Sequence, residues 1–208
     1  MGLGKFIAFE GGEGAGKSTQ ALMLAEKLKE QGLSCVLTRE PGGTPGAEAI
    51  RNLLLHPPGT GWHAEAEALL FAAARSDHVV KLICPTLERG EWVICDRFVD
   101  SSRAYQGAAG SLGDDAVRTL HAIGSGGLLP DLTIVLSTNA GEVADRLSAR
   151  DGGMADAIGG RDAAYHRRVG AAFELFAAAE PARFVVIDGA RSVEEVHASV
   201  MQAIEGLC

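Results

Sequence analysis

Hydrophobic residues fall into short continuous runs that alternate with longer stretches of helical spacing. The continuous runs occupy residues 6–9, 34–38, 92–96, 132–136 and 183–188, and such runs are typical of strands covered on both faces of a parallel sheet. Apolar residues recur every three to four positions elsewhere, which predicts helices at 20–31, 47–55, 64–89 (kinked at Pro85), 114–123, 142–149, 163–179 and 193–207. This order predicts an α/β fold of three layers, with helices flanking a parallel sheet of five strands.

The run from Gly11 to Ser18 has the pattern G-x-x-x-x-G-K-[ST] and follows the first expected strand. Its glycines let backbone N–H groups converge on phosphate oxygens, and the following helix adds partial positive charge. A glycine-rich turn with a chance Lys-Ser is the alternative, but strand before and helix after favour a nucleoside triphosphate site. We expect Lys17 to reach the β- and γ-phosphates and Ser18 to hold Mg²⁺. The expected cofactor-binding residues are Gly11, Gly12, Glu13, Gly14, Ala15, Gly16, Lys17, Ser18 and Thr19.

Length and charge narrow the classes of protein that fit. The 208 residues suit one domain spanning 1–208, and the net charge of −8 argues against binding nucleic acid polymers. No apolar stretch is long enough to cross a bilayer and no secretion signal is recognisable, so we expect a cytoplasmic protein that binds no membrane. The four cysteines lack metal-ligand spacing and are expected to be reduced, buried thiols.

A second set of residues suits another phosphate and a base. Asp96 and Arg97 follow an apolar run and therefore lie at the carboxyl end of a strand, where open α/β sheets bind ligands. Arg51, on a neighbouring helix, could bind a phosphate together with Arg97. Considered without Arg97, Arg51 would be read as one half of a surface ion pair. Phe71 and Arg75 share a helical face, which suits stacking and hydrogen bonding of a base; a core phenylalanine beside a surface arginine is the alternative.

Residues 150–161 are glycine-rich, weakly apolar and begin and end with an arginine. A plain solvent-exposed connection would have this composition. Because the chain also has a phosphate-binding loop, we favour a small mobile lid. Such a lid excludes water and brings Arg150 or Arg161 onto the transferring phosphoryl group.

From residue 6 to about residue 188 the chain resembles the bacterial thymidylate kinases. Four segments carry the resemblance: the loop segment from Phe6, Thr-Arg-Glu-Pro-Gly-Gly-Thr from Thr38, Leu-Leu-Phe-Ala-Ala-Ala-Arg from Leu69, and Asp-Arg-Phe-Val-Asp-Ser-Ser-Arg-Ala-Tyr-Gln-Gly from Asp96. Pro-Asp-Leu-Thr from Pro130 is a fifth. The second and fourth are more specific than the phosphate-binding loop, because they distinguish this kinase from its relatives.

The resemblance implies transfer of the ATP γ-phosphate to dTMP with Mg²⁺, in a homodimer. It implies that Phe71 stacks on thymine, that Arg75 contacts its carbonyl edge, and that Tyr105 packs under the sugar. Arg51 and Arg97 would hold the acceptor phosphate, and Glu13 would face the sugar 3′-hydroxyl or the metal. The remaining implied contacts are Glu40 and Pro41 shaping the acceptor pocket, Ser101, Ser102 and Gln106 completing its walls, and Asp96 supporting the metal with Ser18.

The chain departs from the family in the lid. Relatives without an arginine in the phosphate-binding loop usually carry Asp-Arg-[Ile/Phe]-Glu there, whereas this chain has Asp156-Ala157-Ile158-Gly159. We expect Arg150 or Arg161 to replace the missing arginine, giving a catalytic set of Lys17, Glu13, Arg97 and these two. Two alternatives stay open: a homologue that binds nucleotides with little turnover, and a related kinase for another (deoxy)nucleotide.

Overall fold

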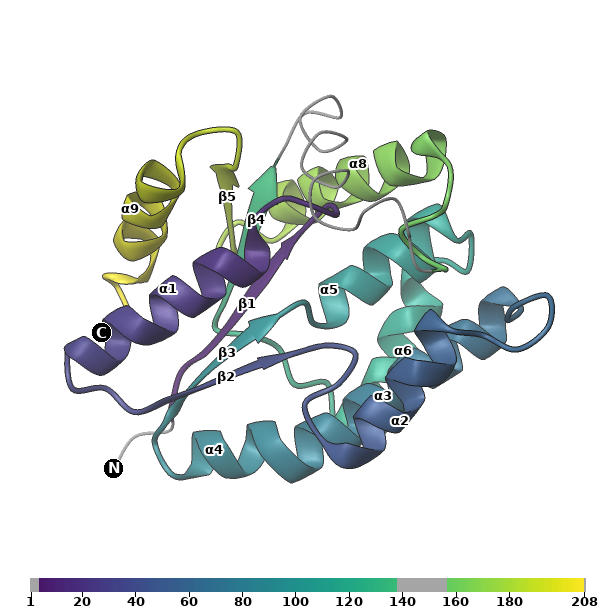
Figure 1. Ribbon diagram of the computed structural model, residues 1–208, viewed down its shortest axis with the longest axis horizontal. Helices are drawn as coiled ribbons and strands as arrows, with labels where there is room; N and C mark the ends of the chain where they lie inside the picture. Colours follow the sequence, from purple (N-terminus) through teal and green to yellow (C-terminus); the bar gives the residue numbers. More distant parts are fainter. Residues whose placement is uncertain (1–3, 138–156, 208) are drawn as a thin grey trace.

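The computed structural model describes residues 4–137 and 157–207, and a parallel sheet of five strands forms its centre (Figure 1). The expected helix at 142–149 and lid residues 150–156 lie outside these residues. The strands are β1 (Phe6–Gly11), β2 (Cys35–Arg39), β3 (Trp92–Asp96), β4 (Leu132–Ser137) and β5 (Phe184–Asp188). They are ordered β2-β3-β1-β4-β5 and every neighbouring pair is parallel. The five-stranded sheet expected from the apolar runs is confirmed.

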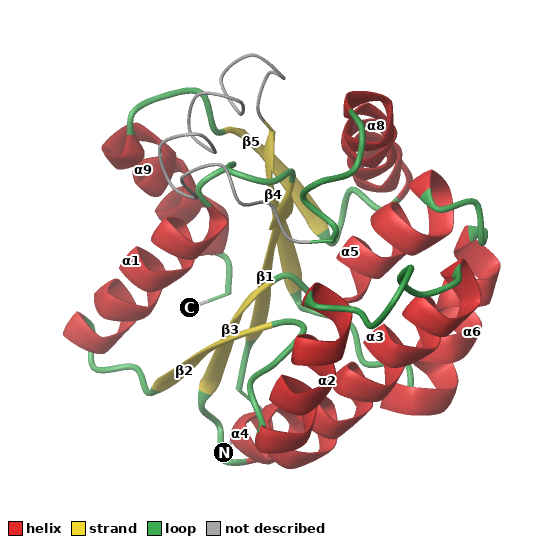
Figure 2. Cartoon of the chain, turned by 45° about the vertical axis from the view of Figure 1, so that its right-hand side comes forward, coloured by secondary structure: helices red, strands yellow, loops and turns green. Residues whose placement is uncertain are grey.

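Helices cover both faces of the sheet and complete the three expected layers. One face carries α1 (Lys17–Glu30) and α9 (Val193–Ile204) (Figure 2). The opposite face carries α2 (Pro45–Leu55), α3 (Ala64–His78), the π-helical turn η1 (Val79–Ile83), α4 (Cys84–Glu88), α5 (Val99–Ser102), the π-helical turn η2 (Arg103–Ala109), α6 (Asp114–Ser125) and α8 (Ala163–Ala179).

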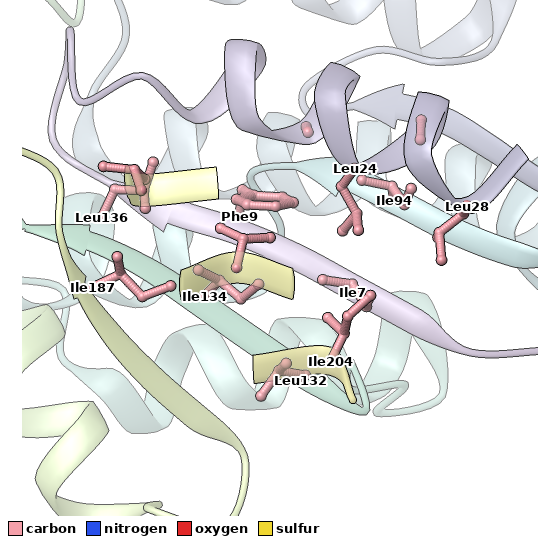
Figure 3. Close-up of a cluster of buried hydrophobic side chains, with 14 of the residues drawn as sticks. Ile7, Phe9, Leu24, Leu28, Ile94, Leu132, Ile134, Leu136, Ile187 and Ile204 are labelled. Atoms are coloured by element: carbon pink, nitrogen blue, oxygen red, sulfur yellow. The ribbon is translucent and has the colours of Figure 1, made fainter. Parts of the chain in front are cut away.

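Alternate residues of β1 enter the two layers of core. Ile7 and Phe9 pack with Leu24 and Leu28 of α1, in the cluster drawn in Figure 3. Phe6 and Ala8 belong to a second cluster on the opposite face, with η1 and α5. Because successive strand residues point to opposite faces, Glu10 follows Phe6 and Ala8 toward the α5 side, where it is fully buried.

Three details differ from the sequence-based expectations. The run expected as one helix over 64–89 is divided by η1, where the Cys84 N–H donates to the Val79 carbonyl, five residues back. Pro85 lacks an N–H and its ring would crowd the carbonyl four residues earlier, so the wider turn accommodates it from the preceding residues. The two edge strands, β2 and β5, are not covered on both faces, since Leu37 and Val186 are exposed. Cys95 is buried, but Cys35 and Cys84 are only partly so, and all three are free thiols.

Among the helices of the described residues, none combines the length and apolar character needed to cross a membrane.

Candidate active site

The carboxyl ends of β1, β2 and β3 border a cavity of about 690 Å³. It brings together most of the residues singled out in the sequence. These are Glu13 to Thr19, Glu40, Pro41, Arg51, Phe71, Arg75, Asp96, Arg97, Ser101, Ser102, Tyr105 and Gln106. Gly11, Gly12 and Arg161 do not line the cavity, and Arg150 lies outside the described residues. The cavity also includes Ile158 of the expected lid and residues that the sequence analysis did not single out, among them Arg39, Arg191, Ser192 and Val193.

The phosphate-binding loop joins β1 to α1 and needs glycine at both ends. Gly11 has a φ of 132°, and a Cβ there would lie 2.4 Å from the Leu136 carbonyl oxygen. Gly16 caps α1 with a φ of 90° and no side-chain hydrogen bond. Left-handed backbone of this kind favours glycine. The turn therefore exposes the first N–H groups of α1 to the cavity.

Lys17 is buried at the floor of the cavity, and its ammonium donates to the Gly12 carbonyl at 2.6 Å. Burial, reinforced by the nearby Arg97 guanidinium, lowers the pKa of Lys17 from 10.5 to about 8. The Ser18 hydroxyl donates to the Asp96 carboxylate. The Ser18 Oγ and the Asp96 Oδ2 therefore lie side by side, and Ser18 directly follows Lys17 in the chain.

This pair of oxygens fits Mg²⁺, which prefers oxygen ligands and is commonly held by one or two carboxylates together with substrate phosphates. In residues 4–137 and 157–207, no group of three or more His, Cys, Asp or Glu side chains could hold a metal alone. A metal at Ser18 and Asp96 would therefore depend on phosphate oxygens for further ligands.

Arg97 occupies the turn after β3 with a φ of 69°, which is unusual for a residue other than glycine. Its guanidinium donates to Glu13 at 2.7 Å, to the Ser101 hydroxyl at 3.1 Å and to the Gly11 carbonyl at 3.2 Å. It also lies 5.0 Å from the centre of the Tyr105 ring. Strained backbone of this kind persists where surrounding contacts impose it, and here they fix a cation in the lining of the cavity.

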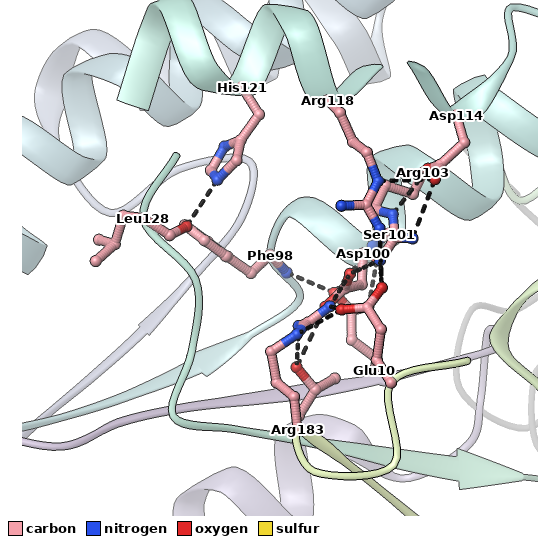
Figure 4. A network of polar contacts seen from close by, with 12 residues as sticks. Glu10, Phe98, Asp100, Ser101, Arg103, Asp114, Arg118, His121, Leu128 and Arg183 are labelled. Atoms are coloured by element: carbon pink, nitrogen blue, oxygen red, sulfur yellow. Dashed lines mark hydrogen bonds and ion pairs between the residues drawn. The ribbon is translucent and has the colours of Figure 1, made fainter. Parts of the chain in front are cut away.

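Glu10 lies beneath Arg97 and was not identified from the sequence. Its carboxylate accepts the Phe98 and Ser101 N–H groups at 2.8 and 2.9 Å and the Ser101 hydroxyl at 2.5 Å (Figure 4). Burial, with the negative charge of Asp100, raises the pKa of Glu10 from 4.5 to about 7. A glutamate inside an apolar strand is a visible sequence signal, because such a residue needs buried partners.

The part of the cavity expected to hold the base is built on α3. Phe71 is 9% exposed and lines the wall, as a stacking residue would. The Arg75 Nε donates to Glu40 at 2.7 Å, and its Nη2 donates to Ser102 at 2.8 Å. Glu40 also contacts the buried His78 ring at 3.0 Å, and that ring contacts Thr38. His78 was missed in the sequence, although it lies one helical turn beyond Arg75.

Arg51 and Gln106 also line the cavity, as expected for acceptor contacts. The Arg51 Nη1 donates to the Pro41 carbonyl at 2.6 Å, which ties α2 to the turn after β2. The Gln106 Nε2 donates to Glu67 at 2.9 Å. The other Glu67 oxygen accepts from Arg161, which also donates to the Tyr165 hydroxyl. In this conformation, Arg161 therefore contacts Glu67 and Tyr165 outside the cavity lining rather than the phosphate-binding loop.

A buried network of charges supports the wall from behind (Figure 4). Asp100 accepts from Arg103 at 2.8 Å and from Arg183 at 2.6 Å. Arg103 in turn contacts Asp114 and Glu180. These residues lie outside the cavity lining, so we assign them a structural role.

Comparisons with known proteins agree with this geometry. A family model described as "Thymidylate kinase" matches residues 9–200. A thymidylate kinase of Rhizorhabdus wittichii is 53% identical over 204 residues, covering 98% of both chains. One from a Bradyrhizobium species is 49% identical over 204 residues, covering 98% of this chain and 90% of that protein. Among solved structures, the thymidylate kinase of Ehrlichia chaffeensis matches with a TM-score of 0.78 and 34% identity, over 99% of this chain and 100% of that chain.

Proposed function

Because the chain belongs to the thymidylate kinase family, we propose that its cavity aligns ATP and dTMP end to end and transfers the γ-phosphate to give ADP and dTDP. One observation carries the proposal: the phosphate-binding loop, Arg97 and the α3 base wall border one continuous cavity. A cavity that held only a donor nucleotide would need no second phosphate contact and no second base wall.

The donor phosphates would lie on the α1 N-terminus, with Lys17 between the β- and γ-phosphates. Ser18 and Asp96 are the residues that would hold Mg²⁺. When bound, the ion neutralises charge on the phosphoryl oxygens. Lys17 and the backbone N–H groups would orient the same oxygens from the protein side.

The acceptor would lie between α2, α3 and η2. Arg97 and Arg51 would hold its phosphate, Phe71 would stack on thymine, and Tyr105 would pack against the sugar. A nucleoside monophosphate is largely dianionic at neutral pH, so its oxygen attacks without a general base. Catalysis then depends on alignment and on neutralising charge at the transferring group.

A steady-state assay tests the proposal with dTMP, dUMP, dCMP and dGMP as acceptors and Lys17→Ala as the blank. We expect dTMP to be preferred, with dUMP a poorer substrate, since one methyl in an apolar site contributes only about 1–3 kcal/mol. Purines should fail because they exceed the space beside Phe71. A preference for another acceptor would indicate a different nucleotide kinase. A dTMP-dependent rise in melting temperature without ADP formation would indicate a binding homologue.

We propose further that Arg150 or Arg161 takes the place of the lid arginine that is absent at position 157. An arginine on the transferring phosphoryl can contribute on the order of 10³–10⁵ in rate. Ala157 is exposed and adjoins Ile158, which lines the cavity. We expect Arg150→Ala or Arg161→Ala to lower kcat at least tenfold, and Ala157→Arg to raise it. If neither alanine variant changes kcat more than a few-fold, both assignments fail.

We also propose a homodimer working in the cytoplasm, with α3 and α6 at the contact. Leu69, Val80 and Ile123 are 56%, 64% and 79% exposed. Leu69 and Val80 are eleven residues apart along α3 and η1, about three helical turns. Gly124 packs closely on α3, where an added Cβ would lie 3.6 Å from the Ser76 Cβ. Exposed large apolar residues on neighbouring helical elements are typical of an interface.

A further inference from the structure

Glu67, Phe71 and Arg75 lie at intervals of four residues on α3 and therefore share one helical face. Phe71 and Arg75 line the acceptor end of the cavity, with Gln106 facing them from η2. Glu67 does not line the cavity, but its carboxylate contacts Gln106 directly. This face of α3 thus carries the Phe71 ring and the Arg75 cation in the cavity wall. The Glu67 carboxylate lies one helical turn before the ring, behind the wall.

The Gln106 amide can present either of two groups to a base. Its Nε2 donates and its Oε1 accepts. In the structure the Nε2 is committed to Glu67 at 2.9 Å, and the side chain is 4% exposed. Within residues 4–137 and 157–207, the Gln106 Oε1 accepts no hydrogen bond, although Gln106 lines the cavity. The acceptor atom is thereby left for the ligand.

Arg75 presents the opposite polarity. Its Nε and Nη2 are committed to Glu40 and Ser102, and in the described part of the chain its Nη1 has no partner. Arg75 and Gln106 therefore offer one donor and one acceptor. Thymine has a carbonyl oxygen at position 4 and an N–H at position 3, which match a donor and an acceptor. Cytosine has an amino group and an unprotonated nitrogen at these positions, which is the reverse pattern.

We propose that Glu67 is a positioning residue for acceptor selection: by holding the Gln106 Nε2, it fixes the Gln106 Oε1 as the group presented to the base. Glu67 is itself held, because its second oxygen accepts from Arg161 and its side chain is 13% exposed. A carboxylate is suited to this task because it only accepts hydrogen bonds. It can therefore bind the Gln106 Nε2 but not the Gln106 Oε1. The proposal rests on the proposed binding of dTMP at this wall.

The test compares kcat/KM for dTMP and dCMP in the wild type, Glu67→Met and Glu67→Gln. Methionine keeps the length of the side chain but removes the strong acceptor, so the Gln106 amide becomes free to turn. We expect the dTMP:dCMP ratio to fall roughly three- to tenfold, the equivalent of one hydrogen bond. Glutamine can hold the Gln106 amide by either of its groups, so Glu67→Gln should lower the ratio less than Glu67→Met does.

Both variants lose the ion pair with Arg161, so any change in kcat that arises through Arg161 should appear in both. That change cancels in the dTMP:dCMP ratio, which reports on the base contacts. Glu65→Ala is the matched control, since Glu65 is exposed on the same helix. Its ratio should equal that of the wild type. Melting temperatures of all variants are measured, and Glu67→Ala replaces Glu67→Met if the methionine variant does not fold.

A double-variant cycle then identifies the route. If Glu67 acts through Gln106, Glu67→Met should change the ratio no further in a Gln106→Ala background. An unchanged ratio in Glu67→Met, or additive effects in the double variant, would overturn the assignment. A wild type that shows no preference for dTMP over dCMP would instead overturn the proposed function, so the two failures are distinguishable.

Discussion

Glu10 is completely buried, yet the three hydrogen bonds it accepts favour its ionised form. Desolvation and Asp100 outweigh them, and the carboxyl pKa rises to about 7. Between pH 4.5 and 7 the folded protein therefore holds a proton on Glu10 that the unfolded chain has released.

This difference predicts a pH dependence of stability. Because the folded state binds more protons in that window, the free energy of unfolding should fall as pH rises from about 4.5 to 7, by about 3 kcal/mol in total for this group. The Glu10→Gln variant stays neutral and can still accept both N–H groups, so its stability should lack this component. Urea unfolding of both proteins at pH 5, 6, 7 and 8 measures it. If the difference in the free energy of unfolding between the wild type and Glu10→Gln stayed constant with pH, the prediction would be contradicted.

Lys17 predicts a pH dependence of donor binding. Its pKa of about 8 means that the ammonium of the unliganded protein loses its proton above that pH. Phosphate charge favours the protonated form, so ATP binding should take up protons, and log Kd for ATP should rise by up to about 1 per pH unit above pH 8. Calorimetric titration from pH 7 to 9.5 measures this. Arginine stays protonated throughout, so Lys17→Arg should bind with a weaker pH dependence, whatever its affinity.

The buried charges around Asp100 join elements that are distant in sequence. Arg103 belongs to η2, Thr133 to β4, and Arg183 immediately precedes β5. Asp100 is fully buried and receives hydrogen bonds from all three, so it fixes α5 against the sheet.

Removing Asp100 should therefore be costly. Asp100→Ala leaves Arg103 and Arg183 with fewer buried partners, and we expect it to lower the free energy of unfolding by about 3–5 kcal/mol. Arg118→Ala is the control, because its side chain is 48% exposed and it contacts the same network only at the edge. It should change stability by less than about 1 kcal/mol. Chemical denaturation of both variants measures these changes in the free energy of unfolding. Equal losses in the two variants would mean that the buried ion pairs of Asp100 stabilise the fold no more than the exposed pairs of Arg118 do.

Local pattern predicted most of the strands and helices because their apolar residues face a continuous core. It did not predict α5 and η2, since residues 99–109 include Asp100, Ser101 and Arg103, which are polar but largely or partly enclosed by tertiary partners. The same holds for the site. Lys17, Ser18 and the positions supplied by the family resemblance meet in the cavity, whereas Glu67 and His78 act through residues 39 and 38 positions away. Such pairings are specified only once the chain has folded.

The exposed apolar surface of α3 and α6 bears on the assembly of the whole protein. If this surface forms the proposed homodimer, Ile123→Asp should shift the protein toward monomer, because a charge would be buried without a partner. Leu175→Asp is the matched control: Leu175 is 69% exposed on α8, outside the proposed surface. Sedimentation of the three proteins over a range of concentrations measures the effect. A wild type that is monomeric throughout, or two variants that dissociate equally, would contradict it.

The alternation along β1 has a consequence for how this protein can vary. Inserting one residue before Phe9 would exchange the two sides of everything after it: Phe9 would turn toward α5, and Glu10 would enter the apolar layer beneath α1. A pair of inserted residues would preserve the sidedness but would shift Glu10 and Gly11 by about 7 Å along the strand, away from the Phe98 N–H and the Leu136 carbonyl. Insertions in this strand should therefore be lost from any library selected for function, single ones because they exchange the two faces and double ones because they displace the start of the phosphate-binding loop.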